Sequence, residues 1–150
     1  MAIPFVPDDF GVPAGFMSAE FSMEPLGAQH NERDHVAWMS SVEHILSTPG
    51  FEGSDWPAPM TLEANLADLV KHARDFDDRT GFTYSILDED DVIGCLYIYP
   101  SSAPDHDASV RSWVAVDHSD LDVVVWKQVS DWLVTRWPFE NPLYAPRTQV

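Results

Sequence analysis

The sequence has few cations, a single cysteine and no glycine after Gly94. Its 150 residues include 8 Lys and Arg against 25 Asp and Glu, which gives a formal net charge of −17. A field of that sign repels phosphate backbones and anionic lipid, so we expect no nucleic acid and no membrane as partners. A small amine or another cationic ligand is favoured instead, although such a charge also serves solubility alone.

Metal and disulfide chemistry find little support in the sequence. Cys95 alone excludes an internal disulfide and any zinc site built from cysteine pairs. No HExxH motif occurs, and the acidic run from Asp88 to Asp91 lacks the spacing and the glycine of a calcium loop, so we expect no metal. No apolar run could span a bilayer, and no cationic segment precedes an apolar one near residue 1, so we expect a cytoplasmic protein.

The sequence does have enough apolar residues for a packed core. Hydrophobic residues make up 45% of the chain and six residues are Trp, which is too apolar for a disordered chain. A length of 150 residues is typical of one domain. Residues 1–16 carry three prolines and two glycines without periodicity, so they predict an irregular N-terminal arm before a single domain over 17–150.

The first half of that domain predicts one strand and two helices. The strand runs from Met17 to about Leu26, and an apolar stripe at helical spacing predicts a helix with Asn31 as its cap that ends near Pro49. Residues 51–60 contain two prolines and a glycine and predict a loop.

The clearest amphipathic pattern follows Thr61, which is placed to cap the second helix. Apolar residues recur at helical spacing as far as Phe76. Gly81 stands where a left-handed residue would end this helix.

The second half predicts a hairpin, a strand, a helix and a last strand. FTYSIL and VIGCLYIY are β-branched and aromatic runs separated by four acidic residues, which would form the tip of the hairpin. VRSWVAV is the next strand, and a helix that Pro138 ends leads to a short strand at 143–145, parallel to it. In the turn SDLD, Ser119 or Asp120 is expected to cap this helix and Asp122 to lie in its first turn.

This order of elements, with the stretches YSILDEDDVIGCLYIYP and SWVAVD, resembles the GNAT superfamily of N-acetyltransferases from about residue 17 onward. The resemblance implies an α/β fold, a three-layer sandwich with a mixed central sheet and helices on both faces. It implies N-acetylation of a small amine with acetyl-CoA as donor. In the family, a strand backbone pairs with pantetheine and the following turn binds pyrophosphate. Those roles would fall on Trp113, Val114 and Val116, and on Leu121, Asp122 and Val123.

The turn departs from the family pattern, which reads Arg or Gln, two residues, Gly, one residue, then Gly or Ala. Small residues are needed there because successive backbone amides at a helix N-terminus hold the phosphates. This turn has no glycine and carries Asp117, Asp120 and Asp122. The alternative to an acetyltransferase is therefore a non-catalytic GNAT-fold binding or dimerisation module that no longer binds acetyl-CoA.

No catalytic residue is assigned from the sequence. The Tyr that often protonates the leaving thiolate in the family belongs to a helix after the last strand, and this chain stops within six residues of Tyr144. A sheet edge left uncovered in this way predicts a homodimer. Cys95 is expected to be a buried, inert thiol and His106 a solvated loop residue. Three residues on neighbouring strands could line a cleft or belong to the core: Tyr97, Arg111 and Trp113.

Overall fold

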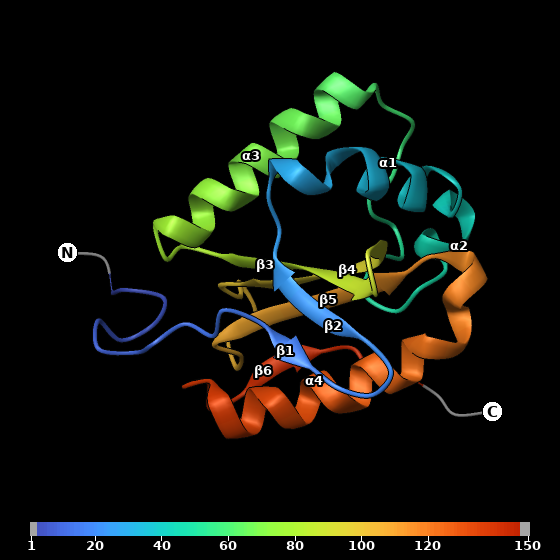
Figure 1. Ribbon diagram of the computed structural model, residues 1–150. Coiled ribbons are helices and arrows are strands. Elements are labelled where there is room, and N and C mark those ends of the chain that lie inside the picture. The colour runs from blue at the N-terminus through green and yellow to red at the C-terminus, as the bar shows by residue number, and fades with distance from the viewer. Residues whose placement is uncertain (1–2, 148–150) are drawn as a thin grey trace.

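The computed structural model describes residues 3–147 and shows a six-stranded sheet with helices on both faces (Figure 1). The strands lie in sequence order, and every neighbouring pair is antiparallel except β5 and β6, which are parallel as expected. The elements are β1 (Phe16–Met17), β2 (Ser22–Pro25), the 3₁₀ turn η1 (Ala28–His30), α1 (Asn31–Met39), α2 (Val42–Leu46), α3 (Leu62–Asp77), β3 (Phe82–Asp88), β4 (Asp91–Tyr99), β5 (Ala108–Val114), the 3₁₀ segment η2 (Val116–Leu121), α4 (Asp122–Arg136) and β6 (Pro142–Tyr144). The α/β sandwich expected from the sequence is confirmed.

The sheet separates two apolar cores. Helices α1, α2 and α3 cover one face and α4 covers the other (Figure 1). Trp38 and Trp113, both fully buried, anchor the core on the side of α1 and α3. Trp132 and Trp137 belong to the core on the side of α4, and the N-terminal arm joins that core through the buried Val6.

Strand β5 presents alternate residues to these two cores, and this alternation positions the functional groups. Trp113 packs on the side of α1 and α3, whereas Val110 and Val114 pack on the side of α4. Because side chains alternate along a strand, Arg111 lies on the same side as Trp113, and Ser112 lies on the side of α4. One strand therefore serves both candidate sites described below.

Two predictions in the N-terminal half are wrong in detail. The single strand from Met17 to Leu26 is instead a short hairpin of β1 and β2, because Ser18 makes a turn in which its amide and hydroxyl both bond the carbonyl of Phe21. The predicted first helix is divided into α1 and α2 near Ser41, whose hydroxyl donates to a carbonyl of α1.

Capping was predicted correctly at one helix and wrongly at two. The hydroxyl of Thr61 accepts a hydrogen bond from the amide of Ala64 at 3.1 Å and caps α3. Asn31 is the first residue within α1, because η1 leads into that helix without a side-chain cap. Leu121 occupies the cap position of α4, again without a side-chain hydrogen bond, so neither Ser119 nor Asp120 caps it.

Gly81 does not end α3 in a left-handed conformation. Arg79 takes that conformation, with φ of 62°, and its guanidinium is held by the carbonyls of Pro7 and Phe10 in the N-terminal arm. Gly81 is required for a different reason: a Cβ atom there would lie 2.0 Å from the ring of Tyr99. The glycine permits close approach of a ring from the neighbouring strand.

No helix within residues 3–147 is long and apolar enough to cross a membrane. Strand β6 lies at one edge of the sheet and has three residues. Whether a second copy of the chain covers this edge stays a prediction.

Candidate functional site

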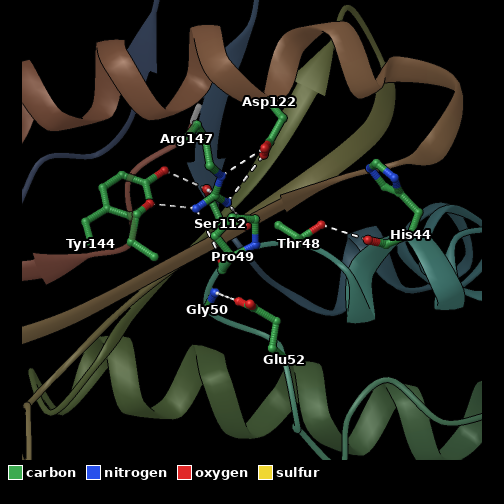
Figure 2. Close-up of polar contacts among 10 residues, drawn as sticks. His44, Thr48, Pro49, Gly50, Glu52, Ser112, Asp122, Tyr144 and Arg147 are labelled. Atoms are coloured by element: carbon green, nitrogen blue, oxygen red, sulfur yellow. Dashed lines mark hydrogen bonds and ion pairs between the residues drawn. The ribbon is translucent and has the colours of Figure 1, made fainter. Parts of the chain in front are cut away.

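Strands β5 and β6 pair over only three residues, and Arg147 stands beyond the point where the pairing ends. The last paired residues are Val110 and Tyr144. The Arg147 side chain then reaches back to β5 and to the start of α4, where it is 2% exposed (Figure 2). We call this place, formed by the end of β5, the first turn of α4 and Arg147, the β5–α4 corner.

Arg147 is bound on several sides at the β5–α4 corner. Its Nε donates to Asp122 Oδ2 at 2.8 Å, and its Nη2 donates to the carbonyl of Ser112 at 2.7 Å (Figure 2). Its Nη1 donates to the carbonyls of Ala145 at 2.9 Å and Pro49 at 3.2 Å. The ion pair and these hydrogen bonds thus give the guanidinium its partners within the chain, and a buried charge requires such partners.

Tyr144 completes the corner from β6. Its hydroxyl and that of Ser112 lie 2.6 Å apart, and the guanidinium carbon of Arg147 lies 5.7 Å from the centre of its ring (Figure 2). Burial raises the pKa of Tyr144 to about 12, so its hydroxyl stays protonated at neutral pH.

The predicted pantetheine residues lie where β5 ends, and two of their polar groups have partners within the chain. The amide of Val116 donates to the hydroxyl of Ser41 at 2.9 Å. The indole of Trp113 is buried and donates to the hydroxyl of Tyr97 at 3.0 Å. Val114 belongs to the apolar core on the side of α4.

The predicted pyrophosphate residues lie at the start of α4. Asp122 is in the first turn, as expected, and its carboxylate is held by Arg147. Leu121 and Val123 flank it and are half-buried, and Leu121 packs against the core. The three residues are adjacent in the chain, and the first turn of α4 therefore carries two bulky side chains and one acidic side chain.

These residues do not fit acetyl-CoA. A diphosphate needs free amides and small side chains at a helix N-terminus. Here a carboxylate occupies that position, and the amide of Val116 and the carbonyl of Ser112 are engaged within the chain. A pantetheine chain along this edge of β5 would have to displace Arg147.

A separate pocket of about 400 Å³ lies on the other face of the sheet, beneath α1 and α3. That volume is in the range of small-molecule sites. We call it the α1–α3 pocket. Its lining residues are Leu26, Asp34, Phe51, Trp56, Asn65, Asp68, Leu69, Lys71, His72, Tyr97, Tyr99 and Arg111.

Aromatic rings form one wall of the α1–α3 pocket. The ring centres of Phe51, Trp56 and Tyr97 lie 6.0–6.4 Å from one another. The guanidinium carbon of Arg111 lies 4.9 Å from the centre of the Phe51 ring and 5.8 Å from that of Tyr97. These are cation–π distances, so this wall attracts positive charge. Tyr97 and Arg111 thus line a cleft, while Trp113 lies in the core.

Asp34 places a buried carboxylate on this pocket. It is 4% exposed, and its Oδ2 accepts a hydrogen bond from Asn65 Nδ2 at 3.0 Å. Asn65 is oriented by the indole of Trp38, which donates to its Oδ1, and by Asn31, which accepts from its Nδ2. Burial is the main cause that raises the pKa of Asp34 to about 6.

His72 lies on the same pocket in a chain of hydrogen bonds. Its Nδ1 is 2.8 Å from the hydroxyl of Tyr99, which donates to Asp75 Oδ2 at 2.9 Å. Because the Tyr99 hydroxyl donates its hydrogen bond to Asp75, it accepts one from Nδ1 of His72, and Nε2 of His72 carries the lone pair. Burial lowers the pKa of His72, so the ring is neutral at neutral pH.

Cys95 and His106, the other two residues considered from the sequence, lie in a strand and in a loop. Cys95 is buried, and burial raises the pKa of its thiol. His106 lies in a loop beside the carbonyl of Asn141. Between residues 3 and 147, no three His, Cys, Asp or Glu side chains come together in a way that could hold a metal ion.

No protein-family model and no curated protein matches this sequence. Solved structures do resemble it. The microcin C7 self-immunity acetyltransferase MccE, solved with acetyl-CoA and AMP, has a TM-score of 0.61 and 13% identity over 81% of this chain and 67% of its own. RimJ from Mycobacterium smegmatis, solved with CoA-disulfide, has a TM-score of 0.64 and 14% identity over 92% and 68%.

The ribosomal-protein-S5-alanine acetyltransferase from Vibrio fischeri is similar at a TM-score of 0.60 and 14% identity, over 81% of this chain and 67% of its own. These neighbours are acetyltransferases, and they show that the chain has the GNAT acyl-CoA N-acyltransferase fold. The fold that the resemblance implied is confirmed.

Sequence reasoning missed Arg147, Asp34 and His72. Arg147 lies three residues beyond the last strand, and nothing in the pattern there indicates that it turns back toward Asp122. Asp34 stands in a helix among other charged residues, and only its burial distinguishes it. His72 could have been noticed, because it is a polar residue adjacent to the apolar stripe of the second predicted helix.

Proposed function

We propose that this protein is a GNAT-fold binding module that does not use acetyl-CoA at the β5–α4 corner. The observation that carries the proposal is the ion pair of Arg147 and Asp122, with Nε to Oδ2 at 2.8 Å, in the position where the family resemblance puts pyrophosphate. The α1–α3 pocket remains as the site for a small ligand.

Energetics favour this proposal over donor binding. A diphosphate at the corner would lie near Asp122, and two unit charges several ångströms apart in a partly wet site repel by roughly 1 to 4 kcal/mol. Displacing Arg147 to make room would also leave that carboxylate without its counter-charge. Both terms oppose the same binding event, and no glycine is present to bring backbone amides near the phosphates.

Titration with acetyl-CoA tests the proposal. We expect no calorimetric signal and no thermal shift at millimolar acetyl-CoA. A dissociation constant in the low micromolar range would contradict it. Desulfo-CoA is the matched control ligand, because it keeps the diphosphate and the pantetheine chain and lacks only the thiol. Any binding that persists with it therefore does not depend on the thioester.

The second candidate is an N-acetyltransferase that acts on a small amine with acetyl-CoA as donor. It is favoured by the likeness to solved acetyltransferases and by the divergence of β5 from β6 after Val110 and Tyr144. Release of coenzyme thiol from acetyl-CoA in the presence of a panel of primary amines tests it. If the Arg147→Lys variant turned over faster than the unmodified chain, the result would favour this candidate. It would also mean that Arg147 hinders binding of the donor.

A further inference from the structure

The α1–α3 pocket carries a cation whose charge is not balanced within the chain. The Arg111 guanidinium has no hydrogen bond or ion pair with another side chain of residues 3–147, and it lies over the rings of Phe51 and Tyr97. Arg111 is exposed at the rim of the pocket. Of the Lys and Arg residues within 3–147, only Lys71 and Arg147 form an ion pair with a carboxylate. Arg111 differs from the other unpaired cations because it lies on the α1–α3 pocket.

The same pocket carries an anion that also lacks a counter-charge. Asp34 is 4% exposed, and within the described residues only its Oδ2 accepts a hydrogen bond, from a neutral amide. No cation within residues 3–147 forms an ion pair with it. A buried carboxylate in this condition gains from an ammonium group placed against its other oxygen.

The other titratable side chains of the pocket, all in the part of the chain that the structure describes, form no ion pair with Arg111 or Asp34. Lys71 is held by Asp75 one turn away, with Nζ to Oδ2 at 2.9 Å. His72 is neutral, as argued above, and Asp68 lies exposed on α3. A positive group at the rim and a negative group inside thus face one cavity with an aromatic wall.

We propose that the α1–α3 pocket binds a small zwitterion that carries an ammonium and a carboxylate, such as a free amino acid with an apolar side chain. The ammonium contacts Asp34, the carboxylate pairs with Arg111 in the two-pronged geometry that guanidinium favours, and the side chain packs on Trp56 and its neighbours. This inference names the ligand class of the pocket that the proposed function leaves for a small ligand, and it requires no acetyl-CoA.

Three probes with one ring separate the two charges. Phenylalanine carries both charges, phenethylamine lacks the carboxylate, and 3-phenylpropionate lacks the ammonium. Calorimetry without acetyl-CoA should give phenylalanine an affinity about tenfold or more above each of the other two. Equal affinity for phenylalanine and phenethylamine, or no binding of phenylalanine at millimolar concentration, would overturn the proposal.

Variants assign each charge to its residue. Arg111→Gln should remove the preference for phenylalanine over phenethylamine, and Asp34→Asn should remove the preference over 3-phenylpropionate. Arg136→Gln and Asp131→Asn, both exposed on α4 on the other side of the sheet, are matched controls that should keep both preferences. Loss of a preference in a control, or its survival in the matching variant, would refute the assignment, and a thermal melt of each variant checks that it is folded.

Because the probes bind without a donor, this result is independent of the acetyl-CoA titration. Tight acetyl-CoA binding with selective phenylalanine binding would refute the proposed function and leave the zwitterion site standing. If neither acetyl-CoA nor phenylalanine bound, the zwitterion site would be refuted and the proposed absence of acetyl-CoA binding would stand.

Discussion

The β5–α4 corner and the α1–α3 pocket use the same strand in opposite ways. At the corner, Ser112 faces α4 and its carbonyl is bound by Arg147. In the pocket, the neighbouring residue Arg111 faces α1 and α3 and its guanidinium is balanced by no carboxylate within residues 3–147. One site has satisfied its polar groups internally, while the other leaves opposite charges for a ligand.

This difference shows why the fold alone does not decide the function. The β5–α4 corner is the part that the family resemblance assigns to the cofactor, and its polar groups form hydrogen bonds and an ion pair within the chain. The pocket has no motif, and its groups remain free to act on a ligand. Function belongs to the site and not to the fold, and here the two locations lead to different conclusions about the same protein.

The largest effect is expected at the corner. Arg147→Ala removes the partner of Asp122 and the donors to three backbone carbonyls, and should cost about 3 kcal/mol of unfolding free energy because it leaves a mostly buried carboxylate unpaired. Arg136→Ala, an exposed arginine at the end of α4, should change stability by less than about 0.5 kcal/mol. Similar urea midpoints for both variants would mean that the corner is not closed.

The second effect concerns the buried carboxylate of the pocket. Because the pKa of Asp34 is about 6 in the folded state and near 4 when unfolded, the folded state holds its proton more tightly. This contribution to stability is full below about pH 4 and is lost as pH rises through about 6. Asp34→Asn should therefore be more stable than the unmodified chain at pH 8 by about 2 to 3 kcal/mol, with the difference vanishing at pH 4.

Urea unfolding at several pH values measures this difference. The groups that face Asp34 are Asn65 on α3, which favours its charged form, together with His30, His35 and Asp68. Asp131→Asn is the control and should keep the pH dependence of the unmodified chain, since Asp131 is exposed on α4 on the other face of the sheet. A constant difference between Asp34→Asn and the unmodified chain from pH 4 to 8 would show that Asp34 is not desolvated.

A third effect tests how tightly the pocket wall is packed. Gly81→Ala puts a Cβ atom 2.0 Å from the ring of Tyr99 and should destabilise the protein by about 1 to 3 kcal/mol. Gly11→Ala is the control, because its Cβ meets no atom within 4 Å. If phenylalanine binds to the pocket, Gly81→Ala should weaken that binding as well, since Tyr99 lines it. Equal melting temperatures for both alanine variants would mean that the ring moves aside without cost.

Much of the fold could be predicted from the sequence because its signals are local. The stripe of α3, the cap at Thr61 and the two apolar runs of the β3–β4 hairpin depend on neighbouring residues. Some errors come from local turns, as at Ser18 and Ser41, and one comes from a distant contact. Arg79 adopts a left-handed conformation with its side chain bound to the N-terminal arm, and no nearby residue indicates this.

The candidate site was only half predictable for the same reason. The acidic, glycine-free turn at the start of α4 is visible in the sequence, and Asp122 lies in the first turn of that helix as expected. The ion pair that closes it joins residues 25 positions apart. The pocket depends on burial of Asp34 by α3 and on strand alternation that turns Arg111 toward the helices, and both arise only when the elements pack.

The smallest effect distinguishes two neighbouring serines at the corner. Ser40 and Ser41 both donate to the carbonyl of Ala37, but only Ser41 accepts from the amide of Val116, at 2.9 Å. Ser41→Ala should cost about 1 kcal/mol more than Ser40→Ala, because it leaves that amide without its partner. Amide hydrogen exchange at Val116 should accelerate in Ser41→Ala alone. Unchanged protection of this amide would show that the Ser41 hydroxyl does not hold the end of β5, and that the contrast between corner and pocket is weaker than their hydrogen bonds indicate.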